Sequence, residues 1–381
     1  MKATNLTDHP MRREARRRRS ASLPVFPWDT LAEASEVARA HPGGIVDLSV
    51  GTPVDPVAPV IREALASASG APGYPVTAGT PALRESATEA LARRYEVTGL
   101  SPDAVLPVIG TKEFIAWLPT LLGFGAEDVV VVPELAYPTY EVGARLAGAQ
   151  VVLADSLTQL GPSRPALVYV NSPSNPTGRV LGIEHMRKVA DWARQRGALV
   201  VSDECYLGLS WDAEPVSLLH PAVSGGDHTG LLAAHSLSKT SSLAGYRAGF
   251  VAGDPDVIAE LLAVRKHAGM MMPMPVQAAM VAALNDDAHE RAQRDRYARR
   301  REVLLPAVRA AGFTVDHSEG GLYLWTTRGD ECRDTVAWFA ERGILVAPGE
   351  FYGPAGRRHV RIALTATDER IDAAAARLAG E

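Results

Sequence analysis

The sequence predicts an α/β protein with a mostly parallel central sheet in a large domain and a second, smaller α+β domain. The middle of the 381-residue chain alternates short β-branched runs with longer stretches of helical pattern. Such alternation is typical of parallel strands that are covered by helices on both faces. After about Asp256 the alternation ends, and one long helical stretch is followed by several short strands. This change predicts a separate unit that mixes helices and strands.

Six apolar runs are predicted to form buried strands of the large sheet, because they are short, β-branched and bounded by turn residues. They are Val105–Ile109, Val129–Val132, Ala166–Val170, Ala198–Val201, Gly230–Ser236 and Ala248–Ala252. The segments between them are expected to be helical, with Glu113–Leu122 and Ile183–Arg196 as the clearest examples. Ligands of such sheets bind at the carboxyl ends of the strands, so polar residues that follow these runs are the candidates for a functional site.

The smaller domain is predicted from a long arginine-rich helix and a set of short strands. The helix covers Ala288–Ala311, and a last helix begins at Asp368. The strands are Thr314–Val315, Leu322–Trp325, Ile344–Val346 and His359–Leu364. We expect residues 51–260 to form the large domain and residues 261–381 the small one, with residues 23–50 packed on the small domain.

Composition excludes several classes of function. The net charge of −5 gives no field that attracts nucleic acid or a membrane surface, and no apolar run reaches the roughly 18 residues of a membrane-spanning helix. Two cysteines, Cys205 and Cys332, cannot build a disulfide framework, and their spacing suits no metal site. We therefore expect a cytoplasmic protein that binds no metal and contacts neither nucleic acid nor membrane.

The N-terminus carries a dense basic cluster. Arg12, Arg13 and Arg16–Arg19 lie close together, and no apolar signal region follows them. Such a cluster is compatible with a nucleic-acid arm or a targeting signal. We expect residues 1–22 to form a disordered leader or to reflect an over-extended start of the chain.

The most informative motif is a lysine between small hydroxyl residues, Ser236-Leu237-Ser238-Lys239-Thr240, with Arg247 in a Gly-containing turn eight residues after the lysine. A lysine at a strand end can lose its proton and attack a carbonyl, and the hydroxyls and the arginine suit a phosphate dianion. The motif predicts a Schiff-base site for pyridoxal 5′-phosphate (PLP); the alternative is a surface loop with an incidental lysine. Only five of the 39 lysines and arginines are lysines. This scarcity favours a functional role for Lys239, unless the preference for arginine only reflects codon usage.

Four further motifs follow predicted strands. Asn175 lies in an Asn-Pro-Thr-Gly turn that can aim one amide side chain. Asp203 ends a buried run, where a carboxylate needs a partner such as a protonated pyridine nitrogen. Gly110-Thr111 opens a helix whose N–H groups can bind phosphate, and Tyr137 can stack on a pyridine ring. Taken singly, each has a plainer interpretation: an ordinary turn, a helix N-cap aspartate, a common helix start or a core tyrosine.

Together these motifs resemble those of fold-type I, class I/II aminotransferases. The ordered set is Tyr74…Gly79, Gly110-Thr111-Lys112, Tyr137-Pro138-x-Tyr140, Asn175-Pro176-Thr177-Gly178, Asp203-x-x-Tyr206, Ser236-x-Ser238-Lys239, Arg247, Gly320-Gly321-x-Tyr323-x-Trp325, Ala347-Pro348-Gly349-x-Phe351-x-Gly353 and Val360-Arg361-Ile362. The resemblance covers nearly everything from about Asp47 to the end of the chain. It implies a fold-type I PLP-dependent transferase that acts on amino acids and 2-oxo acids.

The resemblance also implies a role for each matching residue around the cofactor. Lys239 resembles the Schiff-base lysine and proton carrier, and Asp203 resembles the acid that keeps the pyridine nitrogen protonated. Asn175 and Tyr206 resemble the donors to the phenolic oxygen, and Tyr137 resembles the stacking ring. The cofactor-binding set is completed by Thr111, Lys112, Ser236, Ser238 and Arg247, of which all but Lys112 form the implied phosphate cup.

Two implied features concern the substrate and a partner subunit. Arg361 resembles the arginine that clamps the substrate α-carboxylate through two parallel hydrogen bonds, and Gly51 resembles the backbone contact to the same carboxylate. Asn175 also belongs to this substrate-binding set. Tyr74 resembles the tyrosine that reaches the phosphate of the neighbouring subunit, which implies a homodimer with shared active sites.

The amino donor is predicted from Lys112 and three longer phrases. In some prokaryotic aspartate aminotransferase relatives a lysine at this position contacts a distal carboxylate, and a lone buried amine needs an anionic partner. The alternative is that Lys112 pairs with Glu113 or Glu134. The phrases at residues 133–143, 270–277 and 361–365 resemble actinobacterial N-succinyldiaminopimelate aminotransferase of lysine biosynthesis.

This resemblance implies transfer between glutamate or 2-oxoglutarate and N-succinyl-LL-2,6-diaminopimelate or N-succinyl-2-amino-6-ketopimelate. The Met-rich run at residues 270–274 either lines an adaptable pocket for the long substrate or is plain core. Three rival functions remain. An aspartate or other amino-acid aminotransferase shares every catalytic residue, and a PLP-dependent carbon–sulfur lyase releases pyruvate without a second keto acid. A non-enzymatic regulator needs a DNA-binding domain, for which roughly 45 leading residues are too few.

Overall fold

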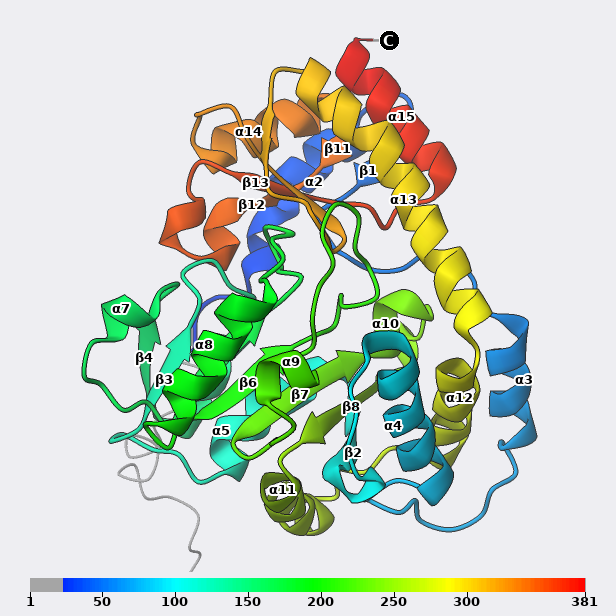
Figure 1. The fold of residues 1–381 in the computed structure, drawn as a ribbon. Helices are drawn as coiled ribbons and strands as arrows, with labels where there is room; N and C mark the ends of the chain where they lie inside the picture. The colour runs from blue at the N-terminus through cyan, green and yellow to red at the C-terminus, as the bar shows by residue number, and fades with distance from the viewer. Residues whose placement is uncertain (1–22, 381) are drawn as a thin grey trace, which may run out of the picture.

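The computed structural model describes residues 23–380, so the predicted leader at residues 1–22 lies outside the described part. Figure 1 shows a large sheet flanked by helices and, above it, a smaller group of strands and helices. The smaller group contains both a helix near the beginning of the described chain, residues 32–39, and the end of the chain (Figure 1). Over residues 23–380, no helix combines the length and the apolar character that a membrane span requires.

The large sheet confirms the predicted α/β architecture. Its strands are β2 (Val105–Ile109), β3 (Val129–Val132), β4 (Gln150–Leu153), β5 (Leu167–Asn171), β6 (Leu199–Asp203), β7 (Leu231–Ser236) and β8 (Ala248–Gly253). They lie in the order β2-β8-β7-β6-β5-β3-β4. Strand β8 runs antiparallel to β2 and β7, whereas the other pairs are parallel. All six predicted strands are present, with ends shifted by at most two residues.

Apolar side chains of the sheet point alternately to its two faces, because successive residues of a strand lie on opposite sides. Val200 belongs to one core cluster and its neighbour Val201 to the other. One face is covered by α3 (Pro59–Ser67), α4 (Pro81–Tyr95), α8 (Ile183–Arg194) and α12 (Met274–Asn285), and the other by α5 (Thr111–Leu121), α6 (Thr139–Ala147) and α11 (Pro255–Ala268). Short helices α7 (Leu157–Leu160), α9 (Pro221–Ser224) and α10 (Leu237–Thr240) lie in the connections.

The smaller group of elements is built around an antiparallel sheet of order β12-β13-β10-β9. Its strands are β9 (Thr314–Asp316), β10 (Tyr323–Thr327), β12 (Ala347–Pro348) and β13 (Val360–Ala363). A second pairing joins β1 (Val46–Asp47) in parallel to β11 (Ile344–Leu345). The helices here are α2 (Ala32–Arg39), α14 (Cys332–Glu341), α15 (Asp368–Ala379) and the long α13 (Asp287–Ala310).

The N-terminal segment packs on this smaller domain. Leu31, Val46 and Leu48 belong to its apolar core, and α2 packs on α14. Helix α12, in contrast, packs with the large sheet although it lies beyond the predicted boundary at residue 260. The exact domain boundaries therefore stay predictions.

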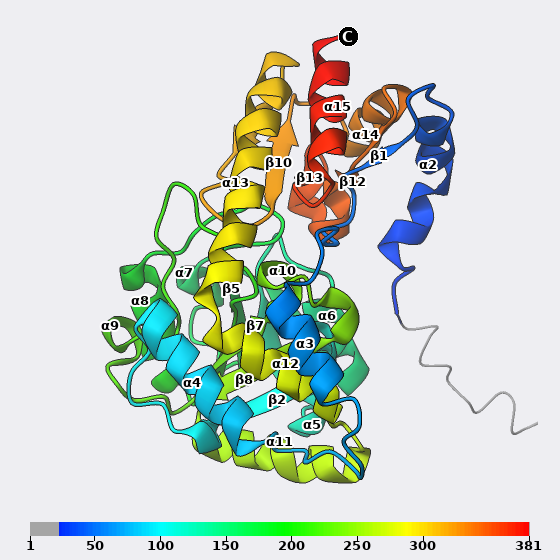
Figure 2. The same ribbon diagram turned by 90° about the vertical axis from the view of Figure 1, so that its right-hand side faces the viewer.

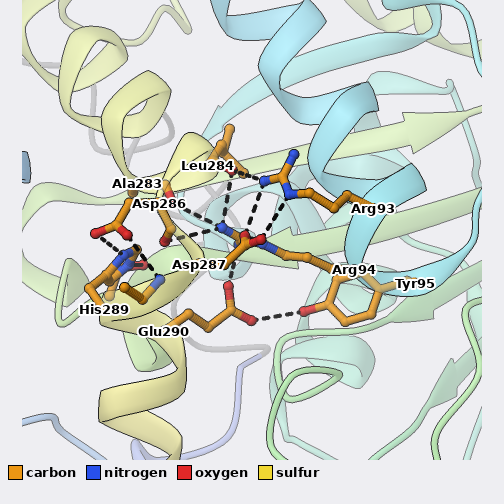
Figure 3. Close-up of polar contacts among 11 residues, drawn as sticks. Arg93, Arg94, Tyr95, Ala283, Leu284, Asp286, Asp287, His289 and Glu290 are labelled. Atoms are coloured by element: carbon orange, nitrogen blue, oxygen red, sulfur yellow. Dashed lines mark hydrogen bonds and ion pairs between the residues drawn. The ribbon is translucent and has the colours of Figure 1, made fainter.

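Helix α13 runs from the large domain to the small one, as Figures 1 and 2 show. Its beginning is fixed by a set of charged residues that we call the anchor cluster: Arg93, Arg94, Asp287 and Glu290 (Figure 3). Asp287 accepts from Arg93 Nε at 2.8 Å and from Arg94 Nε at 2.7 Å, and Arg94 also pairs with Glu290. Arg93 Nη2 donates to the Leu284 carbonyl near the end of α12 at 2.7 Å. The cluster therefore ties α4 to the junction of α12 and α13.

Replacement of Asp287 by asparagine is expected to lower the free energy of unfolding at pH 7 by about 1–2 kcal/mol, because it weakens hydrogen bonds from two guanidinium groups. Hydrogen bonds from Arg93 and Arg94 hold the pKa of Asp287 well below its usual value. A carboxylate with a depressed pKa stabilises the fold above its unfolded-state pKa of about 4 and loses that contribution as the pH falls further. Urea unfolding of wild type and variant should therefore differ at pH 7 and converge as the pH falls below about 4.

Asp295 provides the control for this experiment, because it is an exposed aspartate on the same helix. Asp295→Asn is expected to leave the urea midpoint unchanged at both pH values. Equal midpoints for Asp287→Asn, Asp295→Asn and the wild type at pH 7 would contradict a stabilising role for the anchor cluster.

Candidate active site

A cleft of about 470 Å³ lies between the two domains, at the carboxyl ends of β5, β6 and β7. Twelve of the thirteen predicted site residues line it: Gly51, Thr111, Lys112, Tyr137, Asn175, Asp203, Tyr206, Ser236, Ser238, Lys239, Arg247 and Arg361. The thirteenth, Tyr74, is 96% exposed and does not line the cleft. Its contact with a neighbouring subunit stays a prediction. Among the described residues, no group of three His, Cys, Asp or Glu side chains could hold a metal ion.

Lys239 lies on α10, directly after β7. The Ser236 hydroxyl starts this helix by accepting a hydrogen bond from Ser238 N at 3.1 Å. Lys239 Nζ donates to the carbonyl oxygen of Gly51. Burial, together with the positive charges of nearby arginines, lowers the pKa of Lys239 from 10.5 to about 8. An amine with such a pKa can release and accept a proton close to neutral pH.

Asp203 is the last residue of β6 and is buried. Tyr140 Oη donates to Asp203 Oδ2 at 2.8 Å, and the backbone N–H of Cys205 donates to Oδ1 at 3.2 Å. Burial raises the pKa of Asp203, whereas these hydrogen bonds oppose the rise. Within residues 23–380 the carboxylate forms no ion pair with a lysine, arginine or histidine. A protonated ring nitrogen would supply the cation that this buried carboxylate lacks.

The start of α5 and the side chain of Arg247 form a cradle for an anion. Gly110 has a φ of +78°, and a Cβ atom there would lie 2.2 Å from a guanidinium nitrogen of Arg247, so the position requires glycine. Thr111 opens α5, and the first backbone N–H groups of a helix are free to bind an anion. With the hydroxyls of Ser236 and Ser238 in the same cleft, these groups fit a phosphate dianion.

Arg361, on β13, is 2% exposed and lines the cleft. Its Nη1 donates to Asn175 Oδ1 at 2.8 Å, and its Nη2 donates to the Ser49 carbonyl at 2.7 Å. The guanidinium carbon lies 3.9 Å from the centre of the Tyr323 ring, and Nε has no partner in the part of the chain that the structure describes. A buried guanidinium held in this way fits a carboxylate through parallel hydrogen bonds.

Tyr323 lines the cleft and belongs to the motif Gly320-Gly321-x-Tyr323-x-Trp325, but the sequence alone predicts no role for it. Its hydroxyl oxygen lies 2.9 Å from that of Tyr206. A Cβ atom at position 51 would lie 2.2 Å from the same hydroxyl, so the backbone can approach Tyr323 only because residue 51 is glycine. Tyr323 thus orders three predicted site residues: Gly51, Tyr206 and, through its ring face, Arg361.

The expectation that the Lys112 amine is buried is wrong. Lys112 is exposed, because it occupies the first turn of α5 at the mouth of the cleft. Its Nζ lies 5.4 Å from the Phe26 ring centre and 5.8 Å from that of Tyr137. The alternative ion pairs are also absent from the described chain, since Glu113 pairs with Arg265 at 2.9 Å and Glu134 accepts from Gln159 at 2.9 Å.

Two aromatic residues near the cleft mouth have no counterpart in the predicted site. Phe26 contacts Lys112, and Trp28 lines the cleft and packs on Phe351 with 5.4 Å between ring centres. The Met-rich run does not line the cleft of this chain. Met272 is buried in the core of the large domain, which favours the interpretation of that run as core.

Three polar centres of the cleft match three polar groups of the predicted cofactor. Asp203, a buried carboxylate without a cationic partner among the described residues, matches the ring nitrogen of PLP. The cradle of Gly110, Thr111 and Arg247 matches its phosphate, and the partly buried amine of Lys239 matches its aldehyde. The residues present therefore fit PLP, which would bring an electron-withdrawing ring to this site.

The comparisons with known proteins agree with this assignment. A family model described as aminotransferase class I and II matches residues 44–378. The chain is 76% identical over 359 residues to a probable aminotransferase of Mycobacterium tuberculosis, covering 94% of this chain and 86% of that protein. It is 60% identical over 356 residues to the 4-dedimethylamino-4-oxo-anhydrotetracycline transaminase OxyQ of Streptomyces rimosus, covering 93% and 99% of the two chains. A solved structure of a probable N-succinyldiaminopimelate aminotransferase from Thermus thermophilus superposes with a TM-score of 0.84 at 29% identity, covering 93% and 99%.

Proposed function

Because the chain belongs to the class I and II aminotransferase family, we propose that it is a PLP-dependent transaminase that acts on glutamate and N-succinyl-LL-2,6-diaminopimelate, with their 2-oxo acids as acceptors. One observation carries the proposal of transamination: the partly buried amine of Lys239 and the buried guanidinium of Arg361 line one cleft. Arg361 can hold the carboxylate of an amino acid whose Cα proton Lys239 removes.

Each residue of the cleft has a task in this mechanism. When bound, PLP supplies a ring that withdraws electrons from the reacting carbon. Asp203 would hold a proton on the ring nitrogen, because burial and its single negative charge favour a cationic partner. Asn175 would donate through Nδ2 to the phenolic oxygen, since its Oδ1 already accepts from Arg361. Lys239 Nζ accepts the proton from the substrate Cα, which its pKa of about 8 permits.

Lys112 supports a substrate with a distal acidic group. Its exposed amine stands at the cleft mouth and contacts two aromatic faces, and it has no ion-pair partner in residues 23–380. A carboxylate at the far end of a substrate would supply that partner. N-Succinyl-LL-2,6-diaminopimelate and glutamate both carry such a group, and the Thermus thermophilus neighbour bears the corresponding name.

A second candidate substrate is a polycyclic ketone. It is favoured by the 60% identity to OxyQ and by the aromatic pair Phe26 and Trp28, which could hold a flat ring system near the cleft mouth. Glutamate would be the amino donor in this reaction as well. The two candidates differ in the substrate that exchanges its amino group with glutamate or 2-oxoglutarate, so a comparison of these exchange partners separates them.

A coupled assay of several donors with 2-oxoglutarate is expected to give the highest kcat/KM for N-succinyl-LL-2,6-diaminopimelate. The comparison donors are aspartate, aromatic amino acids and cystathionine, and a tetracycline-type ketone with glutamate tests the second candidate. A preference for aspartate would overturn the proposed substrate, and a higher kcat/KM for the ketone would favour the second candidate. Pyruvate released from cystathionine without any keto acid would instead indicate a carbon–sulfur lyase.

Replacement of Lys112 by methionine is expected to lower kcat/KM about threefold to fivefold for donors with a distal carboxylate, because it removes one exposed ion pair. The same variant should leave kcat/KM for alanine unchanged, since alanine has no distal group. Lys112→Arg keeps the positive charge and serves as the control. An equal loss for alanine and glutamate in the Lys112→Met variant would contradict the role of the amine in substrate choice.

A further inference from the structure

One stretch of backbone crosses from the small domain to the large one beside the reacting amine. This crossing segment, residues 48–58, connects β1 to α3. Residues of the small domain hold the beginning of this segment by hydrogen bonds. Arg361 Nη2 donates to Ser49 O at 2.7 Å, and Thr365 Oγ1 donates to Val50 O at 3.1 Å. The next carbonyl, that of Gly51, accepts from Lys239. The position of Gly51 therefore depends on the contacts that hold the crossing segment before and after this residue.

Asp55 fixes the other side of the segment to α13. Arg300 Nη1 and Nη2 donate to its two carboxylate oxygens at 2.8 and 2.6 Å. Gln293 Nε2 adds a third hydrogen bond at 2.8 Å, and Arg300 Nε donates to Asp368 at the start of α15 at 2.6 Å. The Arg300 and Asp55 side chains are only 3% and 10% exposed. A bidentate, sheltered pair of this kind has a defined geometry as well as strength.

The same face of α13 also contacts the backbone that carries Lys239. Tyr297 Oη donates to the carbonyl of Lys239 at 3.4 Å, and His289 Nε2 lies 2.8 Å from Ser241 Oγ. Residues 289, 293, 297 and 300 are spaced by three or four positions, so they lie along one side of the helix. One rigid element thus holds both stretches of chain whose atoms meet at the Lys239 amine and the Gly51 carbonyl.

We propose that Asp55 and Arg300 form a positioning pair that holds Gly51 in register with Lys239 and Arg361. The inference rests on the proposed function together with the contact between Gly51 and the substrate carboxylate that the family resemblance implies. Neither Asp55 nor Arg300 lines the cleft, so the pair acts through the crossing segment rather than on the substrate. Although burial opposes it, hydrogen bonds from Arg300 and Gln293 hold the pKa of Asp55 below its usual value, so the pair stays charged at neutral pH.

The chain offers a matched control on the same helix. Arg301 follows Arg300 directly, pairs with Asp212 and donates to Ser318 O at 2.9 Å. Asp212 and Arg301 do not line the cleft and do not touch the crossing segment. Asp212→Asn and Arg301→Lys therefore repeat the chemical changes of Asp55→Asn and Arg300→Lys at a pair that should not position Gly51.

The experiment measures steady-state kinetics of the PLP-loaded enzyme and backbone hydrogen exchange of the cofactor-free protein. In Asp55→Asn and Arg300→Lys, KM for every amino donor is expected to rise about tenfold while kcat stays within about threefold, because the loss falls on carboxylate binding. The backbone amides of residues 49–52, 54 and 55 should exchange at least about tenfold faster than in wild type, whereas Pro53 and Pro56 have no amide proton. Asp212→Asn and Arg301→Lys should change neither quantity.

Several outcomes would overturn the positioning role. The role is wrong if both Asp55→Asn and Arg300→Lys keep the wild-type KM values and the wild-type amide exchange rates. It is also wrong if KM rises equally in the control variants, because that would indicate a general loss of rigidity in the fold. If Asp55→Asn does not fold, Arg300→Lys, which keeps the charge, decides the matter. If the wild type transaminates no donor, the proposed function fails, whereas the exchange comparison still tests whether the pair holds the segment.

Discussion

Replacement of Lys239 by methionine is expected to abolish transamination, with kcat lowered at least about 10⁴-fold. The amine is the group that would both carry the cofactor and accept the substrate Cα proton, and loss of a covalent and proton-transfer group has effects of this size. Methionine keeps the length of the side chain and its packing but cannot bind an aldehyde or a proton. The visible absorption of the lysine-bound cofactor should disappear together with activity.

The same substitution is expected to stabilise the cofactor-free protein at pH 7. Burial lowers the pKa of Lys239 from 10.5 to about 8, which means that the fold disfavours the charged amine by up to about 3 kcal/mol. The sign follows from linkage: below pH 8 both the folded and the unfolded chain carry the proton, so the full cost is present. As the pH rises from about 8 to about 10.5, the folded chain loses the proton first and the cost disappears.

Two measurements check this pair of expectations. Urea unfolding of cofactor-free Lys239→Met and wild type should differ in favour of the variant at pH 7 and converge near pH 10.5. Lys266→Met, which changes an exposed lysine of α11, should match the wild type in both stability and activity. A Lys239→Met enzyme that still turns over would refute the assignment of the reactive amine. A variant that is less stable at pH 7 would refute the cost of the buried charge.

The sequence predicts the sheet well because its strands carry a strong signal. Val105–Ile109 and Val129–Val132 are observed as predicted, since buried β-branched runs leave few other structures open. Strand β4 is missed although it contains the apolar run Val151–Leu153. It is an edge strand whose side chains are mostly exposed, so the apolar run does not mark a buried strand here as it does in its neighbours. The local sequence also does not predict that α12 packs on the large sheet, because that contact depends on the surface that other parts of the chain form.

The residues of the cleft also divide into those that a local motif predicts and those that it does not. Lys239, Asp203 and Arg361 can be found from local motifs because each follows or lies on a strand at a distinctive position. Tyr140, which donates to Asp203, belongs to the motif Tyr137-Pro138-x-Tyr140, but the motif alone predicts no role for it. Trp28 comes from the N-terminal segment, and no local spacing ties it to the cleft. Only the folded arrangement brings such residues together, and it also reveals that the Lys112 amine is exposed.

Replacement of Arg361 by alanine is expected to raise KM for every amino donor and to lower kcat/KM about 10²–10³-fold. A buried bidentate pair between guanidinium and carboxylate is worth about 3–4 kcal/mol when one partner is removed. The guanidinium is already oriented by Asn175 Oδ1 and Ser49 O, with Nε left unpaired among the described residues. The substrate carboxylate therefore meets a group that needs little reorganisation, which makes the loss large.

Arg361→Lys and Arg358→Ala separate the possible causes of that loss. Lysine keeps the charge but not the planar fork, so Arg361→Lys should fall between wild type and Arg361→Ala. Arg358 is an exposed arginine close to the start of β13, and its loss should leave KM unchanged. Because every donor shares the α-carboxylate, glutamate, alanine and N-succinyl-LL-2,6-diaminopimelate should all lose affinity by a similar factor in Arg361→Ala. A loss confined to donors with a distal carboxylate would instead place Arg361 at the far end of the substrate, and unchanged KM values for all donors would remove it from the carboxylate site altogether.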